Sequence, residues 1–215
     1  MQSLFLTGRL LPFGAKLTVR HAFCNAETSP IEAVYSFALP RDTSLVKFRI
    51  NADTFSVDSK LEPTAKAVRT YENAVAAGSF AALAREHADG LVNLSLGNLR
   101  PSDRVIVTLD LIAGVEMSDD GLRLRFPFTL APNYHSQARV VHIDGNSFEM
   151  EMPNGILGDA MLPTFHADAH NLPQIGFALS VEPKSGVREV SSPSHHVRLD
   201  LSSELGFGVS LGYLA

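Results

Sequence analysis

The 215-residue sequence contains no tryptophan and a single cysteine, Cys24. One cysteine excludes an internal disulfide framework, and its position between Phe23 and Asn25, near a predicted strand end, favours a small buried side chain over a nucleophile. No apolar run approaches the roughly 18 residues of a membrane-spanning helix, and the opening residues lack the basic start, apolar core and cleavage site of a signal peptide. We therefore expect a cytoplasmic protein with no membrane partner.

Positive charge is also limited, with 18 Lys and Arg against 23 Asp and Glu and a formal net charge of −5. Nucleic acids are bound by clustered basic residues, so this balance argues against a nucleic-acid partner. The 45% apolar and 19% charged residues are typical of a folded globular protein and exclude disorder as the main state. The length allows one large β domain or two small ones, and we expect a single domain over residues 1–215.

Sequence signatures of catalysis and nucleotide binding are weak. The chain has no G-x-x-x-x-G-K-[ST] loop and no G-x-G-x-x-G motif opening a helix. Ser194 and His195 are adjacent, but a nucleophile and its base must converge in the folded chain beside an orienting group and an oxyanion hole. Glu149 and Glu151 share one face of a predicted strand, where solvated carboxylates are ordinary. We therefore expect no catalytic residue, no cofactor and a function that is not enzymatic.

Residues 62–78 carry the clearest helical pattern in the chain. Pro63 suits a first turn and Gly78 suits the left-handed position after a last turn, which predicts a helix over about residues 63–77. Spacings of three and four place an apolar stripe on one face of this helix, formed by Ala67, Val68, Tyr71, Ala74 and Val75. Because such a stripe must be buried, we expect Val68, Tyr71 and Val75 to pack into the core of a sheet.

Most of the remaining chain alternates apolar and polar residues between turn residues, which is typical of strands. Such segments cover residues 4–11, 15–24, 33–39, 45–51, 54–57, 91–96, 104–112, 122–128, 138–143, 147–150, 176–181, 187–190, 197–201 and 208–211. They predict a mainly β protein, an antiparallel β-sandwich-like domain with one inserted amphipathic α-helix. The C-terminal strands, over about residues 174–212, are expected to pack on the same domain, and residues 153–173 to form a long surface loop.

An ordered set of motifs surrounds the predicted helix. Y-S-F-A-L-P at residues 35–40 precedes it, A-x-x-x-Y-x-x-A-x-x-x-G runs from Ala67 to Gly78, and G-N-L-R-P at residues 97–101 follows. The set continues to S-P-S-H at residues 192–195. In order and spacing the sequence resembles the VIT domain, the vault protein inter-alpha-trypsin domain. The resemblance implies a strand over residues 79–87, where the alanines alone would favour a helix.

The resemblance also implies a neighbouring domain. VIT domains usually stand ahead of a von Willebrand A domain, whose metal-ion adhesion site uses a D-x-S-x-S motif that these 215 residues lack. We therefore expect a truncated piece or a stand-alone module that acts as a non-catalytic protein–protein interaction or scaffold module. Its partner would be another protein or a downstream von Willebrand A domain. A carbohydrate-binding β-sandwich is an alternative that exposed aromatic side chains would mark.

A second alternative is a metal-dependent hydrolase. Alternate residues of an extended segment point the same way, so His166, Asp168 and His170 could offer two imidazoles and a carboxylate to one metal ion. A structural zinc needs a fourth ligand and a catalytic one needs an oriented second shell, and this spacing supplies neither. In the VIT family this region resembles a variable connection, and we expect no bound metal.

The last predicted strand lies within residues 206–213. No side chain after Glu204 is charged, so this strand carries no charge. An uncharged edge strand is poorly protected against pairing with another chain. Phe207, Val209 and Leu211 alternate on one face and are predicted to form an interaction surface for a downstream domain or for weak self-association. An interior strand fully paired within the domain is the alternative.

Overall fold

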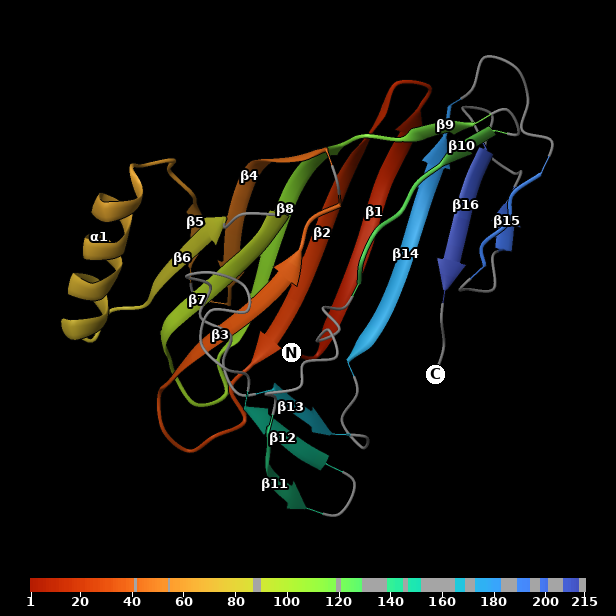
Figure 1. Ribbon diagram of the computed structural model, residues 1–215. Helices are drawn as coiled ribbons and strands as arrows, with labels where there is room; N and C mark the ends of the chain where they lie inside the picture. The colour runs from red at the N-terminus through yellow and green to blue at the C-terminus, as the bar shows by residue number, and fades with distance from the viewer. Residues whose placement is uncertain are drawn as a thin grey trace.

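A computed structural model describes residues 1–40, 42–53, 55–86, 90–118, 121–128, 139–144, 147–151, 165–168, 173–182, 189–193, 198–200 and 207–212. Its largest element is an eight-stranded sheet, the large sheet, with the strand order β15-β16-β14-β1-β2-β8-β4-β5 (Figure 1). The strands are β1 Ser3–Leu11, β2 Gly14–Cys24, β4 Thr43–Ala52, β5 Ser56–Asp58, β8 Arg104–Ala113, β14 Gln174–Val181, β15 Arg198–Asp200 and β16 Phe207–Gly212.

The other strands form three smaller sheets. The small sheet has the order β3-β7-β6, from β3 Ile31–Ala38, β7 Leu91–Leu99 and β6 Ala81–Glu86. The hairpin of β9 Glu116–Ser118 with β10 Gly121–Arg123 stands apart, as does a three-stranded sheet of β11 Arg139–Asp144, β12 Ser147–Glu151 and β13 Phe165–Asp168. The only helix in the described part of the chain is α1, Thr64–Ala76.

The core lies between the large and the small sheet, because each carries its apolar residues on one face. In β2, residues 15, 17, 19, 21 and 23 are buried and the residues between them are not, which is the period of a strand with one solvated face. Figure 1 shows β3, β7 and β6 in front of β2, β8 and β4. The buried cluster joins both sheets and includes Leu17, Val19, Phe37, Leu94, Leu96, Val107 and Leu109. The predicted mainly β, sandwich-like fold with one helix is confirmed.

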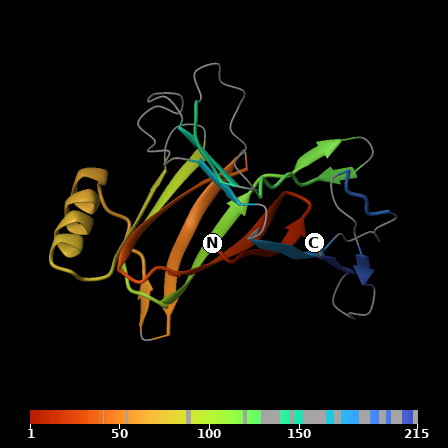
Figure 2. The same ribbon diagram turned by 90° about the horizontal axis from the view of Figure 1, so that it is seen from below.

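One strand pair of the large sheet is parallel rather than antiparallel. β14 runs alongside β1 in the same direction, with Ser3 opposite Gln174 and Leu10 opposite Val181. A short turn forces neighbouring strands to be antiparallel, but these two lie far apart in sequence and are free of that constraint. Arg9 and Glu182 form an ion pair at the end of the same strand pair. The end of the sheet that β14 extends lies far from α1 in both views (Figure 2).

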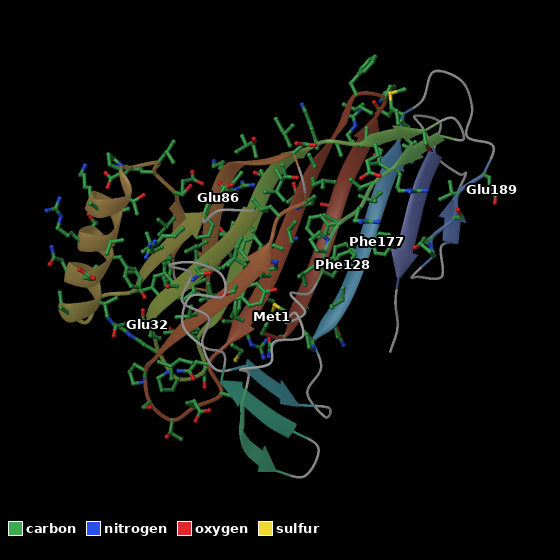
Figure 3. All side chains as sticks on the ribbon, in the orientation of Figure 1. Met1, Glu32, Glu86, Phe128, Phe177 and Glu189 are labelled. Carbon is green, nitrogen blue, oxygen red and sulfur yellow. The ribbon has the colours of Figure 1, made fainter. Side chains whose placement is uncertain are left out.

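Three segments differ from their predicted structure. Of the expected strand 122–128, only Leu122 and Arg123 pair with a neighbour, as part of β10, although Leu124, Phe126 and Phe128 still pack against the core. The ring centroids of Phe128 and Phe177 are 5.6 Å apart, and Figure 3 shows the two side chains side by side. The expected loop 153–173 contains β13, which pairs with β12. Glu189 and Val190, from the predicted strand 187–190, are not in a strand. The strand implied over residues 79–87 is present as β6.

Candidate functional site

The helix α1 packs on β6 and β7 of the small sheet. Ala67, Val68, Tyr71, Ala74 and Val75 are half-buried, and no residue of the helix is fully buried. The expectation that Val68, Tyr71 and Val75 enter the core is therefore wrong in degree. The large and small sheets already enclose the core between them, so the stripe covers the outer face of the small sheet instead.

Tyr71 connects the helix to the far strand of the small sheet. Its hydroxyl donates a hydrogen bond to the Glu32 carboxylate of β3. Burial and this hydrogen bond raise the pKa of Tyr71, in that order of importance. Beneath the ring lies Gly97 of β7, where an added Cβ would stand 3.0 Å from the Tyr71 hydroxyl oxygen. The tyrosine of the helical motif and the glycine of G-N-L-R-P are thus packing partners.

The C-terminal end of α1 is fixed by Gly78 and by Asn98, the residue that follows Gly97. Gly78 has a φ of +73°, and its N–H and that of Ser79 donate to the carbonyls of Val75 and Ala74, at 2.9 and 3.0 Å. This is the backbone pattern of a glycine-terminated helix. The Asn98 side-chain amide donates to the carbonyls of Val75 and Ser79, both at 2.9 Å. The helix end is therefore tied to β7 by hydrogen bonds as well as by packing.

A buried asparagine closes the same end of β7. Asn25, 1% exposed, donates its side-chain amide to the carbonyls of Leu99 at 2.8 Å and Ser29 at 2.9 Å. Its side-chain oxygen accepts from the Glu27 N–H at 2.8 Å. Its own N–H donates to the Asp103 carbonyl at 3.1 Å. Such complete pairing is what a buried amide requires, and it assigns Asn25 a structural role. Cys24 beside it is half-buried rather than fully buried.

His21 lies in an aromatic cluster between the two sheets. The centroid of its ring is 5.1 Å from that of Tyr35, 5.2 Å from that of Phe37 and 6.3 Å from that of Phe23, each pair in an edge-to-face arrangement. The residue is 1% exposed, and its Nδ1 has no hydrogen-bond partner among the described residues. Burial lowers the pKa of His21 to about 4 and raises that of Tyr35 to about 12. Both rings are therefore uncharged at neutral pH.

Two of the three candidate metal residues lie on the three-stranded sheet. His166 and Asp168 belong to β13, while His170 lies outside the described residues. In the strand register His166 is opposite Glu149, which is in turn opposite His142 of β11. The sequence alone predicts only a solvated carboxylate at Glu149, because the pairing of β11, β12 and β13 places it in this row. Among the residues that the structure describes, no group of three or more His, Cys, Asp or Glu is positioned to hold a metal ion.

The predicted interaction strand is not an open edge. β16 pairs with β14 along its whole length, and β15 pairs with its other side over Gly208–Ser210. The expectation of an unpaired edge at Val209 is therefore wrong, because the short strand β15 covers it. Residues 208–212 also spell G-x-S-x-G, but Ser210 lies within a strand and not on the strand-to-helix turn that a nucleophile elbow requires.

A surface not anticipated from the sequence is the face of the large sheet turned away from the small sheet, called here the open face. Its long side chains belong to Phe5 and Arg9 of β1, Lys16 and Arg20 of β2, Asp110 and Ile112 of β8, and Lys47 and Arg49 of β4. Phe5 is 43% exposed and Ile112 is 52% exposed. Phe5 lies over Gly176 of β14, where an added Cβ would stand 2.8 Å from the ring.

This architecture is a mainly antiparallel β-sandwich with one helix on the outer face of its smaller sheet. The sequence profile of the vault protein inter-alpha-trypsin (VIT) domain matches residues 1–111, and the chain belongs to that family. The matched residues run from β1 through α1 into β8. Within the part of the chain that the structure describes, no helix has the length and apolar character needed to cross a membrane.

The similar proteins are much longer than this chain. It is 29% identical to von Willebrand factor A domain-containing protein 5A of Rattus norvegicus over 137 residues, which are 62% of this chain and 17% of that protein. A Dictyostelium discoideum von Willebrand factor A domain-containing protein is 30% identical over 46% of this chain and 11% of its own length. Protein mono-ADP-ribosyltransferase PARP4 of Mus musculus is 25% identical over 61% of this chain and 7% of its own length. The chain thus spans less than a fifth of each relative.

Proposed function

We propose that this chain is a non-catalytic protein–protein interaction module that works beside a von Willebrand factor A domain. The observation that carries the proposal is that the chain matches the VIT domain and that its relatives are named for a von Willebrand factor A domain. The transferase activity in the name of PARP4 belongs to a protein of which only 7% is matched. We further infer that residues 1–215 act as one domain, because β14 and β16 extend the same sheet as β1 and β2.

The geometry supports a scaffold role. The conspicuous motif residues Tyr71, Gly97 and Asn98 are all engaged in holding α1 on the small sheet. His21 is enclosed between the sheets, and an enclosed imidazole is not available to a substrate. Phe207, Val209 and Leu211 remain proposed contact residues, as one face of a paired strand.

Isothermal titration of this chain with the purified von Willebrand factor A domain of the rat relative tests the proposed partner. A saturable interaction with a Kd on the order of micromolar, about −8 kcal/mol, is the expected result. Absence of heat exchange, with both proteins folded by circular dichroism, contradicts the proposal. A Val209→Lys variant that binds as tightly as the native chain would remove the β16 face from the contact.

The strand register favours one second candidate, a metal centre on the three-stranded sheet. His142, Glu149 and His166 occupy one row across β11, β12 and β13. Imidazole and carboxylate groups are the ligands zinc takes in hydrolases. The test is the zinc content of the purified protein. Stoichiometric zinc that is lost in a His142→Ala, His166→Ala double variant and retained in His195→Ala would favour the metal centre over the interaction module.

A further inference from the structure

The open face carries more cations than carboxylates. Asp110 occupies the middle of it, with Thr18 and Lys47 directly opposite on the two neighbouring strands. Lys16 and Arg20 lie two residues to either side of Thr18, so they are diagonal neighbours of Asp110. A single carboxylate is therefore placed among several basic residues.

That carboxylate is already fully engaged. One Asp110 oxygen accepts from the Thr18 hydroxyl at 2.8 Å, and the other accepts from an Arg49 guanidinium nitrogen at 3.2 Å. Lys47 pairs with Asp58 of β5 at 3.1 Å. Lys16 and Arg20 have no ion-pair partner in the part of the chain that the structure describes. Among the described residues, two exposed cations thus lack a carboxylate, on a chain whose net charge is −5.

Exposed apolar side chains flank these two cations. Arg20 is directly opposite Phe5, and Lys16 is directly opposite Ile112. Val46 lies close to these residues in the strand register, at the bulge of β4, and is 61% exposed. Aromatic and aliphatic groups interleaved with arginine on a broad, flat surface are typical of protein–protein contacts. A small anion would instead require a concave site that encloses it.

We propose that the open face is the docking surface for an acidic protein surface, with Lys16 and Arg20 as its charge contacts and Phe5 and Ile112 as its apolar contacts. The proposal rests on the proposed function in taking the occupant to be a protein. Charge complementarity selects the partner, since carboxylates facing Lys16 and Arg20 would neutralise the charges of these two side chains. A nucleic acid is bound by a larger cluster of basic residues that follows its phosphates, and Lys16 and Arg20 alone do not form one.

A fluorescein-labelled deca-glutamate peptide is the probe, and fluorescence anisotropy at low ionic strength is the measurement. We expect saturable binding that weakens as salt is added, because exposed charge contacts are screened. Arg20→Glu should weaken binding by about tenfold or more. Arg69→Glu, on the exposed side of α1, changes the net charge equally and should leave binding within about twofold.

Circular dichroism melts of each variant confirm folding, and Arg20→Gln serves if Arg20→Glu unfolds. Equal weakening in Arg20→Glu and Arg69→Glu, or no saturable binding, overturns the proposal. Tighter binding of a single-stranded DNA 20-mer than of the peptide also overturns it, as does self-association by light scattering that only Arg20→Glu abolishes. Failure of the von Willebrand A titration with peptide binding intact rejects only the partner domain, so the two failures are distinguishable.

Discussion

Gly97 of β7 lies directly beneath Tyr71 of α1, with room for a hydrogen atom but not for a methyl group. A Cβ at position 97 would be 3.0 Å from the Tyr71 hydroxyl oxygen and would overlap the Val75 side chain. The helix approaches the small sheet this closely because β7 has no side chain at that point. The glycine requirement thus comes from the packing of a helix over a sheet.

Gly97→Ala should therefore destabilise the protein by about 1–3 kcal/mol, the usual cost of overpacking. Urea unfolding measures the change. Val75→Ala removes the nearer obstacle, so the alanine at position 97 should cost much less in a Val75→Ala background. Additive effects of the two substitutions would show that the helix does not rest on Gly97.

Tyr71→Phe keeps the ring over Gly97 and removes the hydrogen bond to Glu32. The free energy of unfolding should fall by about 1 kcal/mol, since the bond is partly solvated. In a Glu32→Gln background the same change should cost less, because the acceptor is then uncharged. An equal cost in both backgrounds, from thermal or urea melts, would assign the loss to the ring environment.

The sequence predicts what is local in this fold. The apolar spacing and Gly78 locate α1 to within about two residues, and alternation identifies the inward residues of β2 and β8. Even residues 124–128, which form no ladder, keep the alternation that turns Phe126 and Phe128 toward the core. These features depend on chain geometry over a few residues.

What the sequence could not predict depends on which strands become neighbours. Lys16, Arg20 and Asp110 share one surface only because β8 lies beside β2, more than eighty residues away in sequence. The covering of β16 by β15 and the parallel contact of β14 with β1 are likewise non-local pairings. Such pairings carry no signal in a single sequence without turns that enforce them.

Asn25 offers a test of the buried hydrogen-bond network. Asn25→Asp replaces an amide donor by a carboxylate oxygen that faces the Leu99 and Ser29 carbonyls. The free energy of unfolding at pH 7 should fall by about 3 kcal/mol or more, because a buried charge is left facing acceptors. Asn51→Asp, at an exposed position, should change it by less than about 0.5 kcal/mol. Similar losses for both variants in urea melts would contradict the role of Asn25.

The buried imidazole of His21 makes stability depend on pH. Burial lowers its pKa to about 4 in the folded protein, whereas an unfolded histidine titrates near about 6.5. Above the unfolded pKa both states are neutral and the histidine contributes no pH dependence. As pH falls from about 6.5 to 4 the unfolded state takes up the proton first, so the free energy of unfolding should fall by about 3 kcal/mol in total.

The variant that tests this pH dependence is His21→Leu. It keeps an apolar group of similar size among Phe23, Tyr35 and Phe37 and removes the titrating imidazole. Tyr35, the other titratable ring in the cluster, stays neutral across this range because its pKa is raised to about 12. Urea unfolding at pH 7, 5.5 and 4.5 should show a shallower loss of stability in His21→Leu than in the native chain. The other seven histidines are common to both proteins, so the difference in slope isolates His21. Identical slopes would mean that the imidazole is solvated or hydrogen-bonded in the folded state.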